Sequence, residues 1–121
     1  MTPSHKTIAK NIRLALKAVE SGDILLVEPD VIAADLIDLG QIMEELPILL
    51  TDLLENTEPR DYTGTRPPQR SYEPVISGSE LYAFKKRSNR IGCTIYYKFT
   101  IKDDILWLVS FHEDRPEKKR H

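Results

Sequence analysis

Cysteine is almost absent from this chain of 121 residues, in which Cys93 is the only one. A single thiol excludes an internal disulfide framework and a zinc site built from cysteines. The three histidines are scattered and the carboxylates form no spaced cluster, so we expect neither a metal nor another cofactor. The sequence also lacks any apolar run near the roughly 18 residues of a membrane-spanning helix. Because its first residues show no secretory signal, we expect a cytoplasmic protein with no membrane partner.

Aromatic residues are missing from the first half of the chain, since all nine lie between Tyr62 and Phe111. Basic residues are also scarce there: residues 1–58 have a net charge of −7, whereas residues 59–121 have a net charge of +5. A basic, aromatic half favours an anionic partner, most plausibly nucleic acid. The same composition is also explained by strands that favour aromatic residues and by charged, solvated faces.

The chain is expected to form one domain of residues 1–121. The pattern of apolar residues divides it into a helical part, a sheet and a tail. Residues 1–55 are mainly helical, residues 71–113 form an antiparallel sheet, and residues 114–121 are a charged tail. Helices are predicted at 5–21, 31–39 and 41–54, the last one kinked or restarted at Pro47. Strands are predicted at 71–76, 81–87, 93–102 and 105–112, with a further short one at 23–27. The predicted fold class is α+β, with the N-terminal helices packed on one face of the C-terminal antiparallel sheet.

The last two strands determine which side chains share a face of the sheet. A two-residue turn at 103–104 would mix polar and core positions, whereas a three-residue loop at 103–105 makes one face uniformly apolar. We therefore predict the three-residue loop. The buried side is predicted to hold Tyr97, Phe99, Ile101, Trp107, Val109 and Phe111, with Ile8, Ile12, Leu16, Leu46 and Leu50 from the helices. On the other face this register places Tyr96 opposite His112 and Lys98 opposite Ser110.

The polar patch on that second face suits cleavage of an RNA phosphodiester bond. The 2′-hydroxyl must lose a proton as it attacks phosphorus, the leaving 5′-oxygen must gain one, and cations stabilise the added negative charge. An unperturbed imidazole titrates near neutrality, so His112 can act as acid or base, while Arg66 or Lys98 offsets charge. Each residue alone has a plainer explanation: His112 as a surface histidine, and Tyr96 as a packing residue.

Basic side chains occur in the proline-rich loop before the sheet and in the hairpin that follows it. We expect Arg66, Arg70, Arg87 and Arg90 to lie around one groove that binds RNA phosphates, with Lys85 and Lys86 as further RNA-binding residues. The alternative is that the run 85–87 and Arg90 form a solvated hairpin tip.

Short segments of the chain occur in the order and spacing of a known family. Residues 16–22 read LKAVESG, residues 69–74 read QRSYEP, residues 95–101 read IYYKFTI and residues 104–111 read DILWLVSF. They resemble the first helix with its glycine stop, a Gln-x-x-Tyr-x-Pro element and the last two strands of MqsR-type mRNA interferase toxins, relatives of the RelE superfamily. The resemblance extends over most of the chain.

The resemblance implies a ribosome-independent endoribonuclease that cuts mRNA and is held inactive by a cognate antitoxin protein. Carried over by position, it implies that Gln69, Tyr96 and His112 lie at the active surface, with His112 where the family has lysine. Arg66 is the nearest match to a lysine of the family's loop. The candidate catalytic residues are therefore His112, Tyr96, Gln69, Arg66 and Lys98.

The alternative function is a catalytically silent RNA- or protein-binding module of the same fold. A DNA-binding antitoxin or repressor is disfavoured, because the helices before residue 55 are acidic and DNA would repel them.

Overall fold

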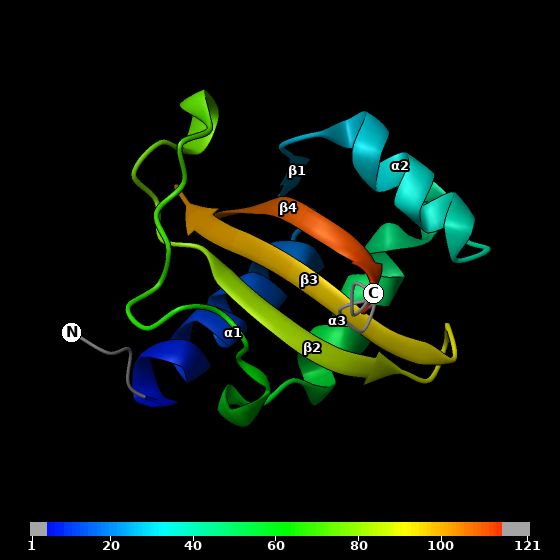
Figure 1. The fold of residues 1–121 in the computed structure, drawn as a ribbon, viewed down its shortest axis with the longest axis horizontal. Coiled ribbons are helices and arrows are strands. Elements are labelled where there is room, and N and C mark those ends of the chain that lie inside the picture. The colour runs from blue at the N-terminus through cyan, green and yellow to red at the C-terminus, as the bar shows by residue number, and fades with distance from the viewer. Residues whose placement is uncertain (1–4, 115–121) are drawn as a thin grey trace, which may run out of the picture.

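The computed structural model describes residues 5–114, in which three α-helices accompany a four-stranded sheet (Figure 1). The elements are α1 (His5–Glu20), β1 (Ile24–Leu26), α2 (Pro29–Asp38), α3 (Leu46–Asn56), β2 (Tyr82–Ser88), β3 (Cys93–Lys102) and β4 (Ile105–Glu113). Three 3₁₀ helices are η1 (Met43–Glu45), η2 (Pro59–Asp61) and η3 (Pro74–Ile76). The predicted α+β class is confirmed. The predicted tail, apart from its first residue, lies outside the described residues.

The sheet is mixed rather than purely antiparallel. Its strands lie in the order β1-β4-β3-β2, and β1 runs parallel to β4 while the other pairs are antiparallel. The antiparallel pairing predicted for the C-terminal strands is confirmed for β2, β3 and β4, and β1 adds a parallel edge that was not predicted. The short strand predicted at 23–27 forms this edge, where α2 and α3 separate it in sequence from the other strands and so allow the parallel pairing.

Helices α1 and α3 cover one face of the sheet, and α2 lies beside the edge formed by β1 and β4. In Figure 1, α1 and α3 pass behind the strands. Helix α1 presents Ile8, Ile12 and Ala15 at helical spacing to the core. Helix α3 starts at Leu46 with Pro47 in its first turn, where a missing backbone N–H costs no helical hydrogen bond, so the predicted restart is confirmed.

The centre of the core is aromatic. Phe84 stacks on Phe99 and Tyr97 with ring centroids 5.8 and 5.7 Å apart, and all three side chains are fully buried. The Tyr97 hydroxyl is satisfied by a 2.6 Å hydrogen bond with the Thr57 hydroxyl at the end of α3.

Within residues 5–114, no helix combines the length and the apolar character needed to cross a membrane.

The β3–β4 connection differs from the predicted loop. Asp103 and Asp104 form a two-residue turn with φ of 56° and 63°, and Lys102 pairs with Ile105. Positive φ at both central residues gives a turn that matches the twist of the two strands. The three-residue loop that the sequence favoured is therefore wrong.

A β-bulge restores the predicted pairing further along the two strands. Phe99 pairs with Leu108 and Lys98 with Ser110, so Val109 has no partner across the ladder. Before the bulge, Leu106 and Leu108 are the buried residues of β4, and the prediction that Trp107 and Val109 lie on the buried side is wrong. Beyond the bulge, Phe111 is buried opposite Tyr97, as predicted.

The segment between α3 and β2 has little regular structure. The strand predicted at 71–76 is wrong, because Pro74 lacks a backbone N–H for a strand ladder and instead begins η3. Isolated bridges join Tyr62 to Phe84 and Arg70 to Glu80. Ile76 and Leu81 of this segment are buried although they lie outside the main core cluster.

Candidate active site

Tyr96 and His112 lie side by side on the face of the sheet opposite the helices. They are direct partners in the β3–β4 register, as predicted, and their rings stack with centroids 5.1 Å apart and planes 20° apart. Their neighbours Tyr97 and Phe111 point into the core, so strand alternation directs Tyr96 and His112 outward. We call this side of the sheet the open face.

Hydrogen bonding defines which nitrogen of His112 can accept a proton. The Nδ1 atom lies 2.9 Å from the carbonyl oxygen of Glu113. A carbonyl oxygen only accepts, so this hydrogen bond requires Nδ1 to carry the proton. In the neutral imidazole, Nε2 then holds the free lone pair and is the proton acceptor.

The Tyr96 side chain is half-buried even though it lies on the open face. Burial raises the pKa of its phenol above the ordinary value of 10.0, because the phenolate would lose hydration. The hydroxyl therefore stays protonated at neutral pH. A protonated phenol can donate a hydrogen bond to a phosphate oxygen or give up its proton to a departing alkoxide.

A hollow of about 200 Å³ includes one residue of the open face of β3, and neither Tyr96 nor His112 lines it. Lys98 lines it and is two residues from Tyr96 on the same strand and face, about 7 Å away at the usual rise of a strand. Gln69 lines the same hollow. The structure thus brings Gln69 and Lys98 to one hollow, and Lys98 connects it along β3 to Tyr96. We call this hollow, lined by Gln69, Arg70, Ser71, Tyr72, Glu73, Leu81, Lys98 and Val109, the loop hollow.

Arg66 is not among the residues that line the loop hollow. Its guanidinium lies over the ring of Tyr62, 5.0 Å from the ring centroid. Burial raises the pKa of the Tyr62 phenol, and the positive charge of Arg66 opposes that rise. The phenol of Tyr62 in turn donates to the carbonyl of Thr65, so this part of the loop is held by its own contacts.

The remaining candidate basic residues are spread over the surface. Arg70 lines the loop hollow and donates to the carbonyl of Gly78. Lys85 pairs with Tyr96 across the sheet and forms a 3.3 Å ion pair with Asp114. Arg87 pairs with Thr94 at the far end of the open face.

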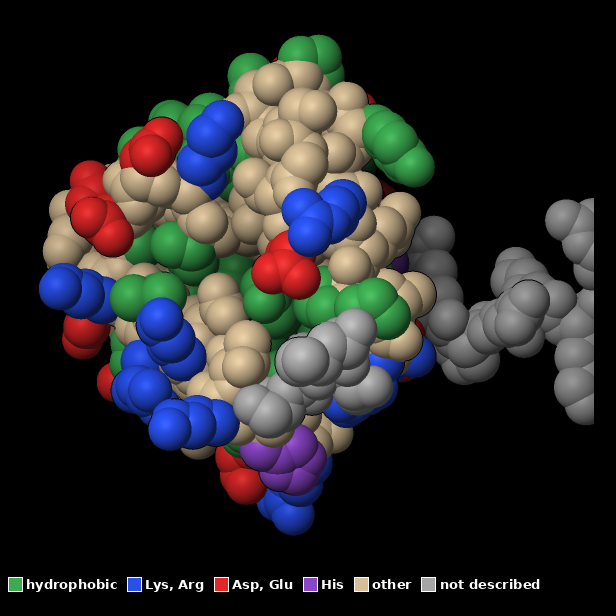
Figure 2. Space-filling view, turned by 90° about the vertical axis from the view of Figure 1, so that its left-hand side faces the viewer, with side chains coloured by type: hydrophobic (Ala, Val, Ile, Leu, Met, Phe, Trp, Pro, Cys, Tyr) green, Lys and Arg blue, Asp and Glu red, His purple; other side chains and the backbone are tan. Residues whose placement is uncertain are grey.

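Lys86 and Arg90 point away from the candidate site. Lys86 alternates with Lys85, shares the covered face with Phe84, and forms a 3.2 Å ion pair with Asp61 that holds η2 against β2. Arg90 lines a different hollow from Arg70, so the single groove predicted for the four arginines is wrong. Figure 2 shows Lys and Arg in separate groups on the end of the molecule that it displays.

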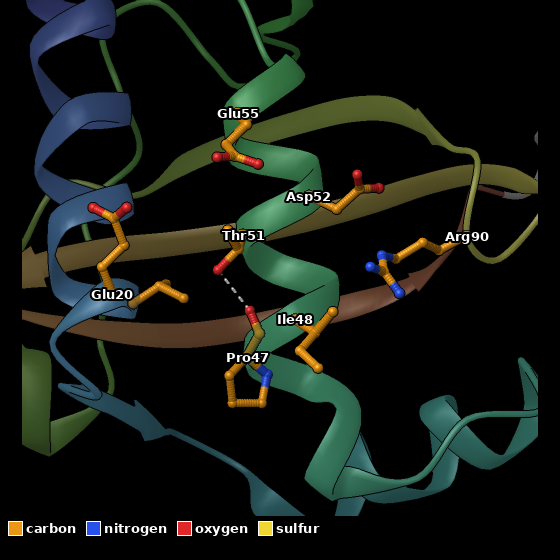
Figure 3. Close-up of a pocket in the computed structure, with 8 residues that line it drawn as sticks. Glu20, Pro47, Ile48, Thr51, Asp52, Glu55 and Arg90 are labelled. Carbon is orange, nitrogen blue, oxygen red and sulfur yellow. Dashed lines mark hydrogen bonds between the residues drawn. The ribbon is translucent and has the colours of Figure 1, made fainter.

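The hollow that Arg90 lines is larger, about 350 Å³, and lies between α1, α3 and the β2–β3 turn (Figure 3). Glu20, Asp52 and Glu55 contribute three carboxylates, and Arg90 extends toward α3 from the turn. This excess of negative charge repels phosphate. The larger hollow is therefore the poorer candidate for RNA.

Sequence reasoning missed Tyr72. Its side chain is 93% exposed, yet it belongs to the loop hollow. The available signal was its position in the segment QRSYEP, three residues after Gln69, where Gln69 and Arg70 were assigned roles and Tyr72 was not.

In residues 5–114, no three side chains of His, Cys, Asp or Glu are grouped so that they could hold a metal ion. Comparison with known proteins adds no assignment. No protein-family model matches the chain, and no curated protein matches it.

Proposed function

We propose that this protein is an endoribonuclease that cuts mRNA without a metal ion, as the toxin of a toxin–antitoxin pair. The observation that carries the proposal is the stacked pair of Tyr96 and His112 on the open face, with Lys98 next along the strand. The resemblance to the MqsR-type toxins includes these same residues and supports the same activity. A cognate antitoxin protein is the partner that the resemblance implies.

The proposed reaction uses the side chains of the open face. Nε2 of His112 accepts the proton of an RNA 2′-hydroxyl as that oxygen forms a bond to phosphorus. The bond between phosphorus and the 5′-oxygen breaks, and the leaving oxygen takes the proton of the Tyr96 phenol. The Lys98 ammonium offsets the negative charge that develops on the phosphorane.

Proton transfer within the stacked pair then completes the cycle. The imidazolium of His112 returns its proton to the Tyr96 phenolate, which restores both groups. The products are a 2′,3′-cyclic phosphate and a free 5′-hydroxyl. The remaining candidates act on binding: Gln69 and Arg70 contact the RNA from the loop, while Arg66, Lys85 and Arg87 contribute positive charge around the face.

The test uses the purified full chain and an end-labelled single-stranded RNA in excess chelator. We expect cleavage with a cyclic phosphate at one new end, and no cleavage of DNA of the same sequence, since DNA lacks the 2′-hydroxyl. Expression of the chain alone is expected to arrest growth. Intact RNA after prolonged incubation at high protein concentration, together with retained RNA binding, would favour the catalytically silent binding module instead.

A further inference from the structure

Tyr72 is the most exposed large hydrophobic residue of the described chain, and its backbone is nevertheless firmly held. On its N-terminal side, Ser71 is buried and its N–H donates to the carbonyl of Ser79 at 2.9 Å. The Ser71 carbonyl accepts the N–H of Gly78, and its hydroxyl accepts the N–H of Glu73.

The segment after Tyr72 is fixed as well. Pro74 sets its own φ at the start of η3, and the Lys102 ammonium donates to the carbonyl of Val75 at 2.9 Å. Ile76 at the end of η3 is fully buried. The aromatic ring therefore projects into solvent from a backbone that is anchored on both sides.

The ring is also placed beside groups that can bind a nucleotide. Tyr72, Gln69 and Lys98 line the same loop hollow, which combines an aromatic side chain, an amide with donors and an acceptor, and a cation. Aromatic rings of this kind stack on the bases of single-stranded nucleic acids, because every base has a π-face. In a duplex, both faces of a base are covered by its neighbours.

We propose that the loop hollow receives one unpaired nucleobase of RNA, with Tyr72 stacked on the base and the Gln69 amide directed at its edge. This inference rests on the proposed function and adds to it the residue that holds a base of the RNA. Because Lys98 lines the hollow and is two residues from Tyr96 on the same strand, a base held there lies close to the catalytic pair. The nucleotide to be cut is thus positioned by a contact outside the catalytic pair.

The test measures binding of a fluorescently labelled oligoribonucleotide to the full chain by anisotropy. Tyr72→Ala is expected to weaken binding of the single strand about 5- to 150-fold, the range that corresponds to loss of one base stack. Tyr72→Phe keeps the ring and is expected to bind like the wild type. Val75→Ala, at an exposed neighbouring position, is the matched control and is expected to have no effect. The same sequence as a duplex is expected to bind weakly to every variant.

The outcomes separate this inference from the proposed function. Wild-type binding of RNA with unchanged affinity in Tyr72→Ala would overturn the stacking role and leave the nuclease proposal intact. The same result would follow if Tyr72 served a protein partner instead. Equal losses in Tyr72→Phe and Tyr72→Ala would also overturn stacking, because the hydroxyl would then make the contact. A wild-type chain that neither binds nor cuts RNA would refute the proposed function and this inference with it.

Discussion

The two faces of the sheet are built from the same strands and differ in what covers them. On the covered face, α1 and α3 pack over a stack of fully buried rings that includes Phe84 and Phe99. On the open face, Tyr96 and His112 stack on each other and remain partly accessible. Along each strand, residues that stabilise the core therefore alternate with residues that lie at the candidate active site.

One extra residue in β4 allows the strand to supply residues to both faces of the sheet. The strand must supply Leu106 and Leu108 to the core near the turn, two residues apart, and Phe111 three residues further on. A regular strand cannot place residues at both spacings on one face. The unpaired Val109 resolves this conflict, and it directs His112 to the open face beside Tyr96.

Phe111→Ala is expected to break the covered face and to have the largest effect. It removes a fully buried aromatic side chain, and such a loss costs about 3–5 kcal/mol of unfolding free energy. Urea unfolding measures this loss. Val109→Ala, at the unpaired bulge residue outside the core, is the matched control and is expected to cost about 1 kcal/mol or less. Equal costs for the two substitutions would contradict the assignment of Phe111 to the covered face and of Val109 to the bulge.

Alkaline pH is expected to destabilise the covered face through Tyr97. Burial raises the pKa of its phenol well above 10.0, so the folded state holds this proton more tightly than the unfolded state does. Stability is therefore complete below pH 10 and falls as pH rises toward the folded-state pKa, by up to about 1.4 kcal/mol per pH unit.

Denaturant unfolding between pH 8 and pH 11 measures this slope. Tyr97→Phe is expected to reduce it, and Tyr96→Phe on the open face is the matched control with a smaller change. A slope that Tyr97→Phe leaves unaltered would show that the buried phenol does not titrate with folding.

The pairing of Tyr96 with His112 could be predicted from the sequence even though the predicted turn was wrong. A three-residue loop and a bulge both shift β4 by one residue, so the two arrangements give the same pairs beyond Lys98. The segment 105–109 is apolar at every position, and alternation therefore could not decide between Trp107 and Leu108 for the core.

The basic residues show a second limit of sequence reasoning. Alternation within β2 separates Lys85 from Lys86, and this could have been predicted from the strand period. The neighbourhood of Arg90 depends on carboxylates of α1 and α3, which are distant in sequence. That Arg90 lies outside the candidate site could therefore be recognised only from the three-dimensional structure.

The salt dependence of RNA binding is expected to differ between variants of the two hollows, and this is the smallest of the predicted effects. Lys98→Ala removes one cation from the loop hollow and should lower the slope of log affinity against log salt by about 0.7, the value for one phosphate contact on a single strand. Arg90→Ala in the acidic hollow is the control and should leave the slope unchanged. Equal changes in the two variants would mean that the acidic hollow also contacts RNA.

The central claim is that His112 performs chemistry on the open face and contributes nothing essential to the fold. The most direct measurement compares the RNA cleavage rate and the unfolding free energy of His112→Ala with those of Thr94→Ala, a change on the same face two residues from Tyr96 along β3. We predict that His112→Ala lowers the rate about 10²- to 10⁴-fold, as expected for loss of a positioned acid or base, while both variants unfold within about 0.5 kcal/mol of the wild type. A folded His112→Ala variant that cuts RNA at the wild-type rate would contradict the claim.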